Sequence, residues 1–228
     1  MQGVLVSATD TGVGKTVLSA ALVAAMRAAG VPALPHKPVL TGLEEPVPGD
    51  HEVLGAVAEL PPHEVAPLRY GPAVSPHLAA ALGGADPIDP AALLARARGA
   101  GRGGVAVVEG VGGLMTPLTD SYTLCDLAAE LGLPLLIAAR PGLGTINHCL
   151  LTLAAARAAG LEVRAVVLTP WPERPGALER SNRHTIARMG GVEVAALCRA
   201  KDHSRAELAR VGSQLPWQQW LAMSDCSS

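Results

Sequence analysis

The sequence predicts an α/β protein, a single domain over residues 1–228, in which a mostly parallel sheet is flanked by helices. Short apolar runs recur along the chain, and helical stretches lie between most of them. Hydrophobic residues make up 49% of the chain, aromatic residues make up 2%, and Phe is absent. The core must therefore consist of Ala, Val and Leu, which suits a buried parallel sheet covered by Ala-rich helices.

The order of the elements supports this fold class. Apolar runs short enough to be buried strands lie at 4–6, 33–34, 105–108, 135–138, 163–168 and 194–197. The clearest helices lie at 16–29, 90–100, 123–131 and 145–159, and glycines end the first and the last of them. Strands that alternate with helices predict parallel pairing through crossover connections. We expect long loops and short helices over 42–90, and a polar helix followed by a tail from residue 201.

Composition excludes several classes of partner. The formal net charge is −2 and no cluster of Lys or Arg is present, which argues against a nucleic acid or an acidic membrane as partner. No apolar run approaches the roughly 18 residues of a membrane span, and no charged and apolar leader opens the chain, so we expect a cytoplasmic protein. The four cysteines, which lack Cys-x-x-Cys spacing, are expected to be free thiols: Cys125, Cys149, Cys198 and Cys226.

A phosphate-binding loop follows the first predicted strand. From Thr9 to Thr16 the chain reads Thr-Asp-Thr-Gly-Val-Gly-Lys-Thr, and the first predicted helix begins directly behind it. Small residues let backbone N–H groups point at phosphate oxygens, and the helix N-terminus favours an anion. In such a loop Lys15 reaches the terminal phosphates and Thr16 holds Mg²⁺. Thr9 occupies the first glycine position of the strict pattern, but Gly12 and Gly14 remain, so we predict a P-loop NTPase-type fold.

Two further strand ends carry groups suited to phosphate chemistry, at the edge where open α/β sheets bind ligands. Glu109 ends the third strand and begins a glycine-rich turn, where nucleotide enzymes keep a carboxylate for Mg²⁺. Lys37, held by Pro38, is expected to point into the same crevice as Lys15, where a second cation neutralises a phosphoryl group in transfer. Asp50 is a candidate second Mg²⁺ carboxylate, although taken alone it is more often a turn residue.

The fourth predicted strand leads into a second candidate anion site. Residues 143–148 read Leu-Gly-Thr-Ile-Asn-His and open a helix, so a substrate carboxylate could dock at its N-terminus. The alternative is helix capping by Gly144 or Thr145. The histidines show no metal-ligand spacing, and none is assigned to catalysis.

In this order the motifs resemble those of the dethiobiotin synthetase family, whose members close the ureido ring in biotin synthesis. The family's Gly-Thr-Asp-Thr-x-Val-Gly-Lys-Thr appears at 8–16, its Lys-Pro-Val-x-Ser/Thr-Gly at 37–42, and its Glu-Gly-Ala-Gly-Gly at 109–113. Further matches lie at Ser75-Pro76-His77, at Thr116-Pro117-Leu118 with Asp120, Thr123 and Asp126, and at 143–148.

The resemblance implies a homodimeric ligase that forms C–N bonds from 7,8-diaminononanoate, CO₂ and MgATP, giving dethiobiotin, ADP and phosphate. An amine first captures CO₂ as a carbamate. The carbamate then attacks the γ-phosphate to give a carbamic–phosphoric anhydride, and the neighbouring amine closes the ring and expels phosphate.

The resemblance also implies a role for individual residues. Thr16, Asp50 and Glu109 would hold Mg²⁺, and the catalytic residues would be Lys15 and Lys37, which stabilise phosphoryl charge, with Thr11. Thr11 and Thr41 would position the carbamate and the diamine, with Lys37 also at the substrate. Leu143, Gly144 and Asn147 would grip the substrate carboxylate from the partner subunit, with Asn182 a weaker candidate there. The residues expected at the nucleotide are Gly12, Val13, Gly14, Lys15, Thr16, Val17, Glu109, Gly110, Gly112, Thr169 and Pro170.

The chain departs from the family pattern at three positions. Ala8 replaces a glycine, Gly12 stands where many members carry Glu, and Thr169 stands where an adenine-reading Asn often follows the fifth strand. Thr offers one hydroxyl where Asn offers both a donor and an acceptor. We therefore predict a weakened preference for ATP over other nucleoside triphosphates, which parallel kinetics with ATP, CTP and GTP test.

Two other functions share this fold class. An amidotransferase-type synthetase of the cobyrinic-acid diamide kind needs a glutaminase domain, for which residues after 200 offer neither the length nor a Cys/His pair. A nucleotide-switch ATPase of the partitioning or metallochaperone type usually carries Lys-Gly-Gly-x-Gly-Lys, whereas residues 10–15 here read Asp-Thr-Gly-Val-Gly-Lys. Phosphate release from MgATP without diaminononanoate and bicarbonate would favour the switch.

Overall fold

Six strands form one sheet in the order β2-β3-β1-β4-β5-β6, and each neighbouring pair is parallel. The structure is a computed structural model that describes residues 1–44 and 49–221. The strands are β1 (Gly3–Ala8), β2 (Ala33–His36), β3 (Val105–Glu109), β4 (Leu135–Ala139), β5 (Val163–Trp171) and β6 (Glu193–Cys198). Each predicted apolar run lies within one of these strands, so the predicted parallel sheet is confirmed.

Helices connect the strands and follow the last one. In the described part of the chain they are α1 (Lys15–Ala28), α2 (Asp50–Ala58), α3 (Pro62–Val65), α4 (Pro76–Leu82), α5 (Pro90–Ala100), α6 (Leu124–Leu131), α7 (Thr145–Ala158), α8 (Ala177–Gly190), α9 (Arg205–Gly212) and α10 (Trp217–Leu221). The four predicted helices are confirmed as α1, α5, α6 and α7. Helix α8 was not among them, because it buries only a narrow stripe made of Asn182, Ile186 and Gly190.

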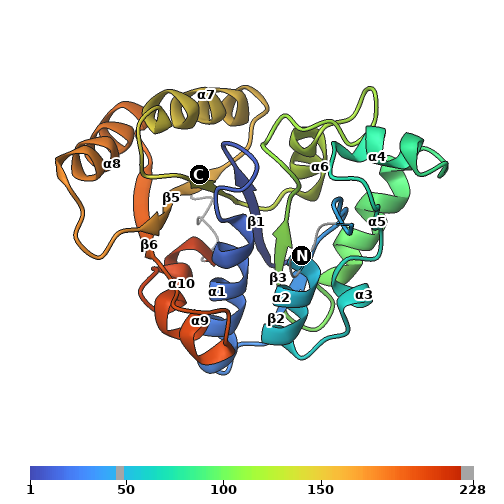
Figure 1. Cartoon of the computed structure of the whole chain (residues 1–228), viewed down its shortest axis with the longest axis horizontal. Coiled ribbons are helices and arrows are strands. Elements are labelled where there is room, and N and C mark those ends of the chain that lie inside the picture. The colour runs from blue at the N-terminus through green and yellow to red at the C-terminus, as the bar shows by residue number, and fades with distance from the viewer. Residues whose placement is uncertain (45–48, 222–228) are drawn as a thin grey trace, which may run out of the picture.

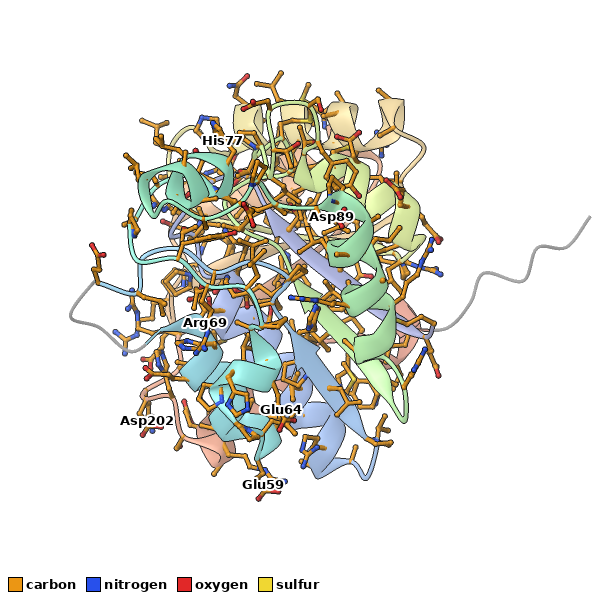
Figure 2. All side chains as sticks on the ribbon, turned by 90° about the vertical axis from the view of Figure 1, so that its right-hand side faces the viewer. Glu59, Glu64, Arg69, His77, Asp89 and Asp202 are labelled. Atoms are coloured by element: carbon orange, nitrogen blue, oxygen red, sulfur yellow. The ribbon has the colours of Figure 1, made fainter. Side chains whose placement is uncertain are left out.

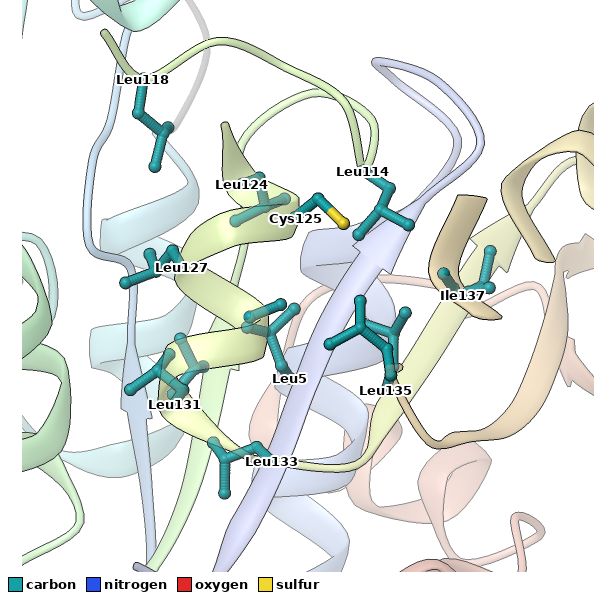
Figure 3. Packing of buried hydrophobic residues seen from close by; sticks show 14 of the residues in the cluster. Leu5, Leu114, Leu118, Leu124, Cys125, Leu127, Leu131, Leu133, Leu135 and Ile137 are labelled. Atoms are coloured by element: carbon teal, nitrogen blue, oxygen red, sulfur yellow. The ribbon is translucent and has the colours of Figure 1, made fainter. Parts of the chain in front are cut away.

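Helices cover both faces of the sheet (Figure 1). Helices α1, α2, α3, α9 and α10 contribute to one buried apolar cluster, and α4 to α8 contribute to the other. Figure 3 shows the second cluster from close by, where Leu124, Leu127 and Leu131 of α6 lie beside Leu5 of β1. Burying one such leucine contributes about 1.5–3 kcal/mol. This apolar packing fixes the strand ends from which the site is built.

The C-terminal helix α10 belongs to the core of its own chain. Trp217 and Trp220 are buried in the same cluster as α1, and the Trp220 indole N–H donates to Glu193 Oε2 at 3.0 Å. The segment is therefore an intrachain part of the fold.

Two further expectations concern the cysteines and membrane-spanning helices. Cys125, Cys149 and Cys198 are free thiols, as expected, while Cys226 lies outside the described residues. Among residues 1–44 and 49–221, no helix has the length and apolar character to cross a membrane.

Candidate active site

The loop between β1 and α1 has the backbone of a phosphate cradle. Gly12 and Gly14 adopt φ values of +68° and +100°, which residues with a side chain rarely adopt. A β-carbon on Gly14 would also lie 2.9 Å from Thr169 Cγ2, so the loop can rest on the end of β5 only with glycine there. Gly14 caps α1 without any side-chain hydrogen bond. The first N–H groups of α1 are thus left for an anion.

A cavity of about 740 Å³ opens at the carboxyl edge of the sheet beside this loop. It collects predicted site residues from segments far apart in sequence: Thr11, Gly12, Gly14, Lys15, Thr16, Val17, Lys37, Thr41, Asp50 and Gly112. Ser75, Pro76, Thr116 and Pro117 complete part of its wall, and they fall within the short family matches to which no role had been attached. The volume suits a small-molecule site.

Lys37 lies between two carboxylates at the floor of the site. Its Nζ is 2.6 Å from Asp50 Oδ2 and 2.7 Å from Glu109 Oε1. The Lys37 side chain is 2% exposed and that of Glu109 is 0% exposed. Burial lowers the pKa of Lys37, but the Glu109 and Asp50 carboxylates outweigh burial and raise it. Lys37 is therefore a buried ammonium group at neutral pH.

Oxygen atoms that suit Mg²⁺ converge next to Lys37. The Thr16 hydroxyl is 2.7 Å from Asp50 Oδ1 and 3.1 Å from Glu109 Oε1. Glu109 Oε2 is buried and has no hydrogen-bond partner within the described residues. Burial raises the pKa of Asp50, but the larger effect of Lys37 lowers it below its ordinary value, so Asp50 is an ionised carboxylate at neutral pH. A hydroxyl and two carboxylates, one of them with an unsatisfied buried oxygen, fit a hard cation that keeps waters and phosphate oxygens as its other ligands.

The protein carboxylates next to Lys37 are few. In residues 1–44 and 49–221, no three His, Cys, Asp or Glu side chains are grouped as a metal site. The residues fit Mg²⁺ because that ion needs only one or two protein carboxylates.

Lys15 shares the cavity and is held by the loop itself. Its Nζ donates to the backbone oxygen of Asp10 at 3.1 Å. Burial lowers the pKa of Lys15 to about 8, while Glu109 opposes the shift and Lys37 adds to it. The negative charge of a bound phosphate chain would favour the protonated form of Lys15 and raise its pKa again.

Several residues predicted to lie at the nucleotide are buried or closely packed. Val13 is buried in the core, and a β-carbon on Gly110 would lie 2.3 Å from Leu124 Cδ2. Thr169 is 1% exposed and packs on Gly14, whereas Pro170 is exposed. The role of Thr169 in recognition of the nucleotide base stays a prediction. Its close packing on Gly14 also limits the size of the side chain at this position.

The start of α7 lies outside the cavity of its own chain. Leu143 is 93% exposed, Asn147 is exposed, and Gly144 caps the helix without a side-chain hydrogen bond. Their contact with a partner's substrate stays a prediction. Asn182 contacts a loop of its own chain, where its Nδ2 donates to Pro141 O at 2.9 Å and to Gly142 O at 3.0 Å, and its contact with a partner's substrate also stays a prediction. Its amide N–H groups hold the loop before α7.

Two matched family residues have a plain structural use. Thr123 Oγ1 accepts from the Asp126 backbone N–H, and Asp126 Oδ2 accepts from the Thr123 N–H at 2.7 Å. This capping box starts α6.

Sequence analysis missed Arg140, whose Nη2 donates to Thr11 O at 3.3 Å. Arg140 directly follows β4, so inspection of every strand end would have found it.

Comparisons with known proteins agree with the fold. A family model described as an AAA domain matches residues 2–202. The ATP-dependent dethiobiotin synthetase BioD of Anaeromyxobacter sp. (strain Fw109-5) is 41% identical over 206 residues, which cover 89% of this chain and 92% of that protein. The protein of the same name from Mycobacterium sp. (strain KMS) is 38% identical over 231 residues and covers 97% and 99%.

A solved structure adds to the assignment of the fold alone. Cyanthece apo McdA superposes with a TM-score of 0.51 at 10% identity and covers 96% of this chain and 95% of that chain. The relatives align with this chain along nearly their whole length, and the strand order and the loop geometry agree with them. The chain therefore belongs to the dethiobiotin synthetase family.

Proposed function

We propose that this chain is a dethiobiotin synthetase that joins 7,8-diaminononanoate and CO₂ at the expense of ATP, working with Mg²⁺ as a cytoplasmic homodimer. The names of its relatives and their coverage support the reaction. The observation that carries the proposal is that Lys15, Lys37, Thr16 and Asp50 line one cavity, with Glu109 bonded to Lys37. Phosphoryl transfer needs such a cluster of positive charge and metal-binding oxygens.

The charges of the site suit transfer of a phosphoryl group to a carbamate. Thr16, Asp50 and Glu109 would hold Mg²⁺, which when bound screens phosphate charge. Lys15 extends from the phosphate loop and Lys37 from the end of β2, so the two ammonium groups reach the cavity from different segments. Their positive charge stabilises the extra negative charge on the phosphoryl oxygens as the bond to ADP breaks.

The two amines of the substrate belong beside Thr11 and Thr41, which line the same cavity. One amine nitrogen bonds to CO₂ and loses a proton, and a carbamate oxygen then displaces ADP from the γ-phosphorus. The second amine attacks the carbamate carbon, phosphate leaves with the bonding pair, and the ring closes. By the family resemblance, the substrate carboxylate would be held by Leu143, Gly144 and Asn147 of a second copy; these residues lie outside the cavity of their own chain.

The experiment is a reconstitution with purified protein, MgATP, bicarbonate and diaminononanoate, in which dethiobiotin is detected by mass and phosphate release is followed in parallel. We expect phosphate release to require both other substrates. Rapid release without them would favour a nucleotide switch and contradict the proposal. Omitting Mg²⁺ should abolish turnover.

Matched variants and nucleotides sharpen this assay. Lys37→Ala should cut turnover while leaving nucleotide binding mostly intact, whereas Lys201→Ala removes an exposed lysine outside the cavity and should behave as the wild type. Parallel kinetics with ATP, CTP and GTP test the weakened base preference, and strong selectivity for ATP would contradict it.

A further inference from the structure

Arg140 contacts the phosphate loop from outside the cavity. It is the first residue after β4, the strand that pairs with β1. Its Nη2 donates to Thr11 O at 3.3 Å, and a β-carbon on Gly12 would lie 3.6 Å from the same nitrogen. In the described part of the chain, Arg140 makes no ion pair that would hold it elsewhere. Its guanidinium group therefore lies against the peptide between Thr11 and Gly12.

The two sides of this peptide face different surroundings. Thr11 and Gly12 line the cavity, and Arg140 does not. The Thr11–Gly12 peptide is trans, and in a planar trans peptide the C=O and N–H groups point in opposite directions. When the Thr11 carbonyl oxygen is held by Arg140, the Gly12 N–H consequently points the opposite way, in a peptide whose two residues line the cavity.

This peptide needs such a restraint. Gly12 has a φ of +68° and no side chain, so its backbone can adopt several conformations at little cost. A hydrogen bond from a charged donor is roughly twice as strong as one between neutral groups, and it polarises the peptide so that the N–H becomes a better donor. Fixing the peptide before a ligand arrives also removes an ordering cost from binding.

Arg140 is itself held on both sides. Before it, Ala139 is a buried residue of β4. After it, the carbonyl groups of Pro141 and Gly142 accept hydrogen bonds from the Asn182 side chain, which is 5% exposed. The backbone from which the Arg140 side chain extends is thus held in place.

We propose that Arg140 is a positioning residue of the phosphate loop, which locks the Thr11–Gly12 peptide so that the Gly12 N–H faces the phosphate chain of the bound nucleotide. This inference rests on the proposed binding of a nucleotide in this cavity. Arg140 acts through the peptide and does not touch the nucleotide.

The test compares three variants of the full chain: Arg140→Ala, Arg140→Lys and the control Arg98→Ala. Arg98 is also an exposed arginine that donates to a backbone carbonyl, Glu130 O at 2.8 Å, but it lies on α5 outside the cavity. The measurements are the Kd values of MgADP and of a non-hydrolysable MgATP analogue, the KM values for ATP and diaminononanoate, kcat, and the thermal midpoint.

Arg140→Ala should weaken the binding of both nucleotides by about tenfold, or about 1.4 kcal/mol, because the peptide that faces the phosphates loses its charged hydrogen-bond donor. The KM for ATP should rise equally, while the KM for diaminononanoate and the thermal midpoint stay at wild-type values. Arg140→Lys should recover most of the affinity, and Arg98→Ala should change nothing.

Three results would overturn the inference: unchanged nucleotide affinity in Arg140→Ala, a loss that follows a lowered thermal midpoint, or a loss for the MgATP analogue without one for MgADP. The last would mean that Arg140 contacts the terminal phosphoryl group directly. The affinity arm does not need the ring-closing reaction. A wild-type chain that binds nucleotide but makes no dethiobiotin would therefore contradict only the proposed function. Active Arg140 variants with unchanged nucleotide affinity would contradict only the role of Arg140.

Discussion

Two consecutive basic residues at the end of β2 are both buried, but their pKa values shift in opposite directions. His36 is 4% exposed, its Nε2 has no hydrogen-bond partner within the described residues, and burial together with Arg96 lowers its pKa to about 4. Lys37 is buried as deeply, yet Asp50 and Glu109 raise its pKa. His36 is neutral at pH 7 and Lys37 is charged. Burial removes charge by default, and it is the carboxylate partners that preserve it.

The comparison also separates stability from function. Because the buried imidazole of His36 is neutral at pH 7, the fold does not bear the cost of burying an ion there. A buried ammonium between two carboxylates loses much of its hydration, and such clusters often stabilise a protein less than apolar packing of the same volume would. The cluster around Lys37 is therefore best explained by its place on the cavity wall.

The largest effect should follow from removing the cation while keeping its aliphatic stem. Lys37→Met takes from Asp50 and Glu109 the cation that lies between them and leaves only Lys15 nearby. We expect a loss of about 3–5 kcal/mol in the free energy of unfolding, typical for breaking a buried pair. Turnover should fall by at least about 100-fold, as when a charge-stabilising group is removed from an active site. Urea unfolding and steady-state kinetics measure both, and a variant as stable and active as the wild type would show that the cluster is dispensable.

The next effect should come from His36, when the free energy of unfolding is measured at falling pH. The pKa of His36 is about 4 in the folded chain and the ordinary value is 6.5, so the unfolded chain binds the proton more readily below pH 6.5. Stability from this group is complete above pH 6.5 and is lost as the pH falls toward 4, by up to about 3 kcal/mol.

The control for this effect is His36→Gln, which cannot titrate. Its unfolding free energy between pH 7 and pH 4 should fall less steeply than that of the wild type. Parallel pH profiles for the two proteins would mean that His36 does not contribute.

The smallest effect should come from an exposed ion pair far from the cavity. Glu59 lies 3.4 Å from Arg27 and 2.7 Å from Arg205, and its side chain is 67% exposed. Figure 2 shows Glu59 and His77, which follows the cavity residue Pro76, at opposite ends of the molecule. Glu59→Gln should cost less than about 1 kcal/mol. The difference should shrink further in 1 M salt, and a larger or salt-independent loss would contradict the comparison.

Most of the fold could be predicted because short apolar runs bounded by glycine and proline mark buried parallel strands. Strand ends also identified Lys15, Lys37 and Glu109, since parallel strands bring their carboxyl ends to one edge. Helix α8 was harder because its buried positions include Asn182 and Gly190, which give no apolar period.

The remaining details depend on which way a side chain turns. Nothing in the sequence shows that Thr169 packs under Gly14, or that Arg140 bends back over the phosphate loop. Both contacts join residues more than a hundred positions apart, and no local pattern encodes them.

The position of the indole rings determines what fluorescence would report on this chain. With Trp217 and Trp220 in α10 and buried against the α1 side of the sheet, much of the emission reports whether the C-terminal helix is docked. Trp171 lies at the end of β5, two residues beyond Thr169, and the Arg183 guanidinium carbon is 5.9 Å from its ring centroid. Replacing both α10 tryptophans with Phe would leave Trp171 as a single optical probe at the end of β5, on the same strand end as Thr169.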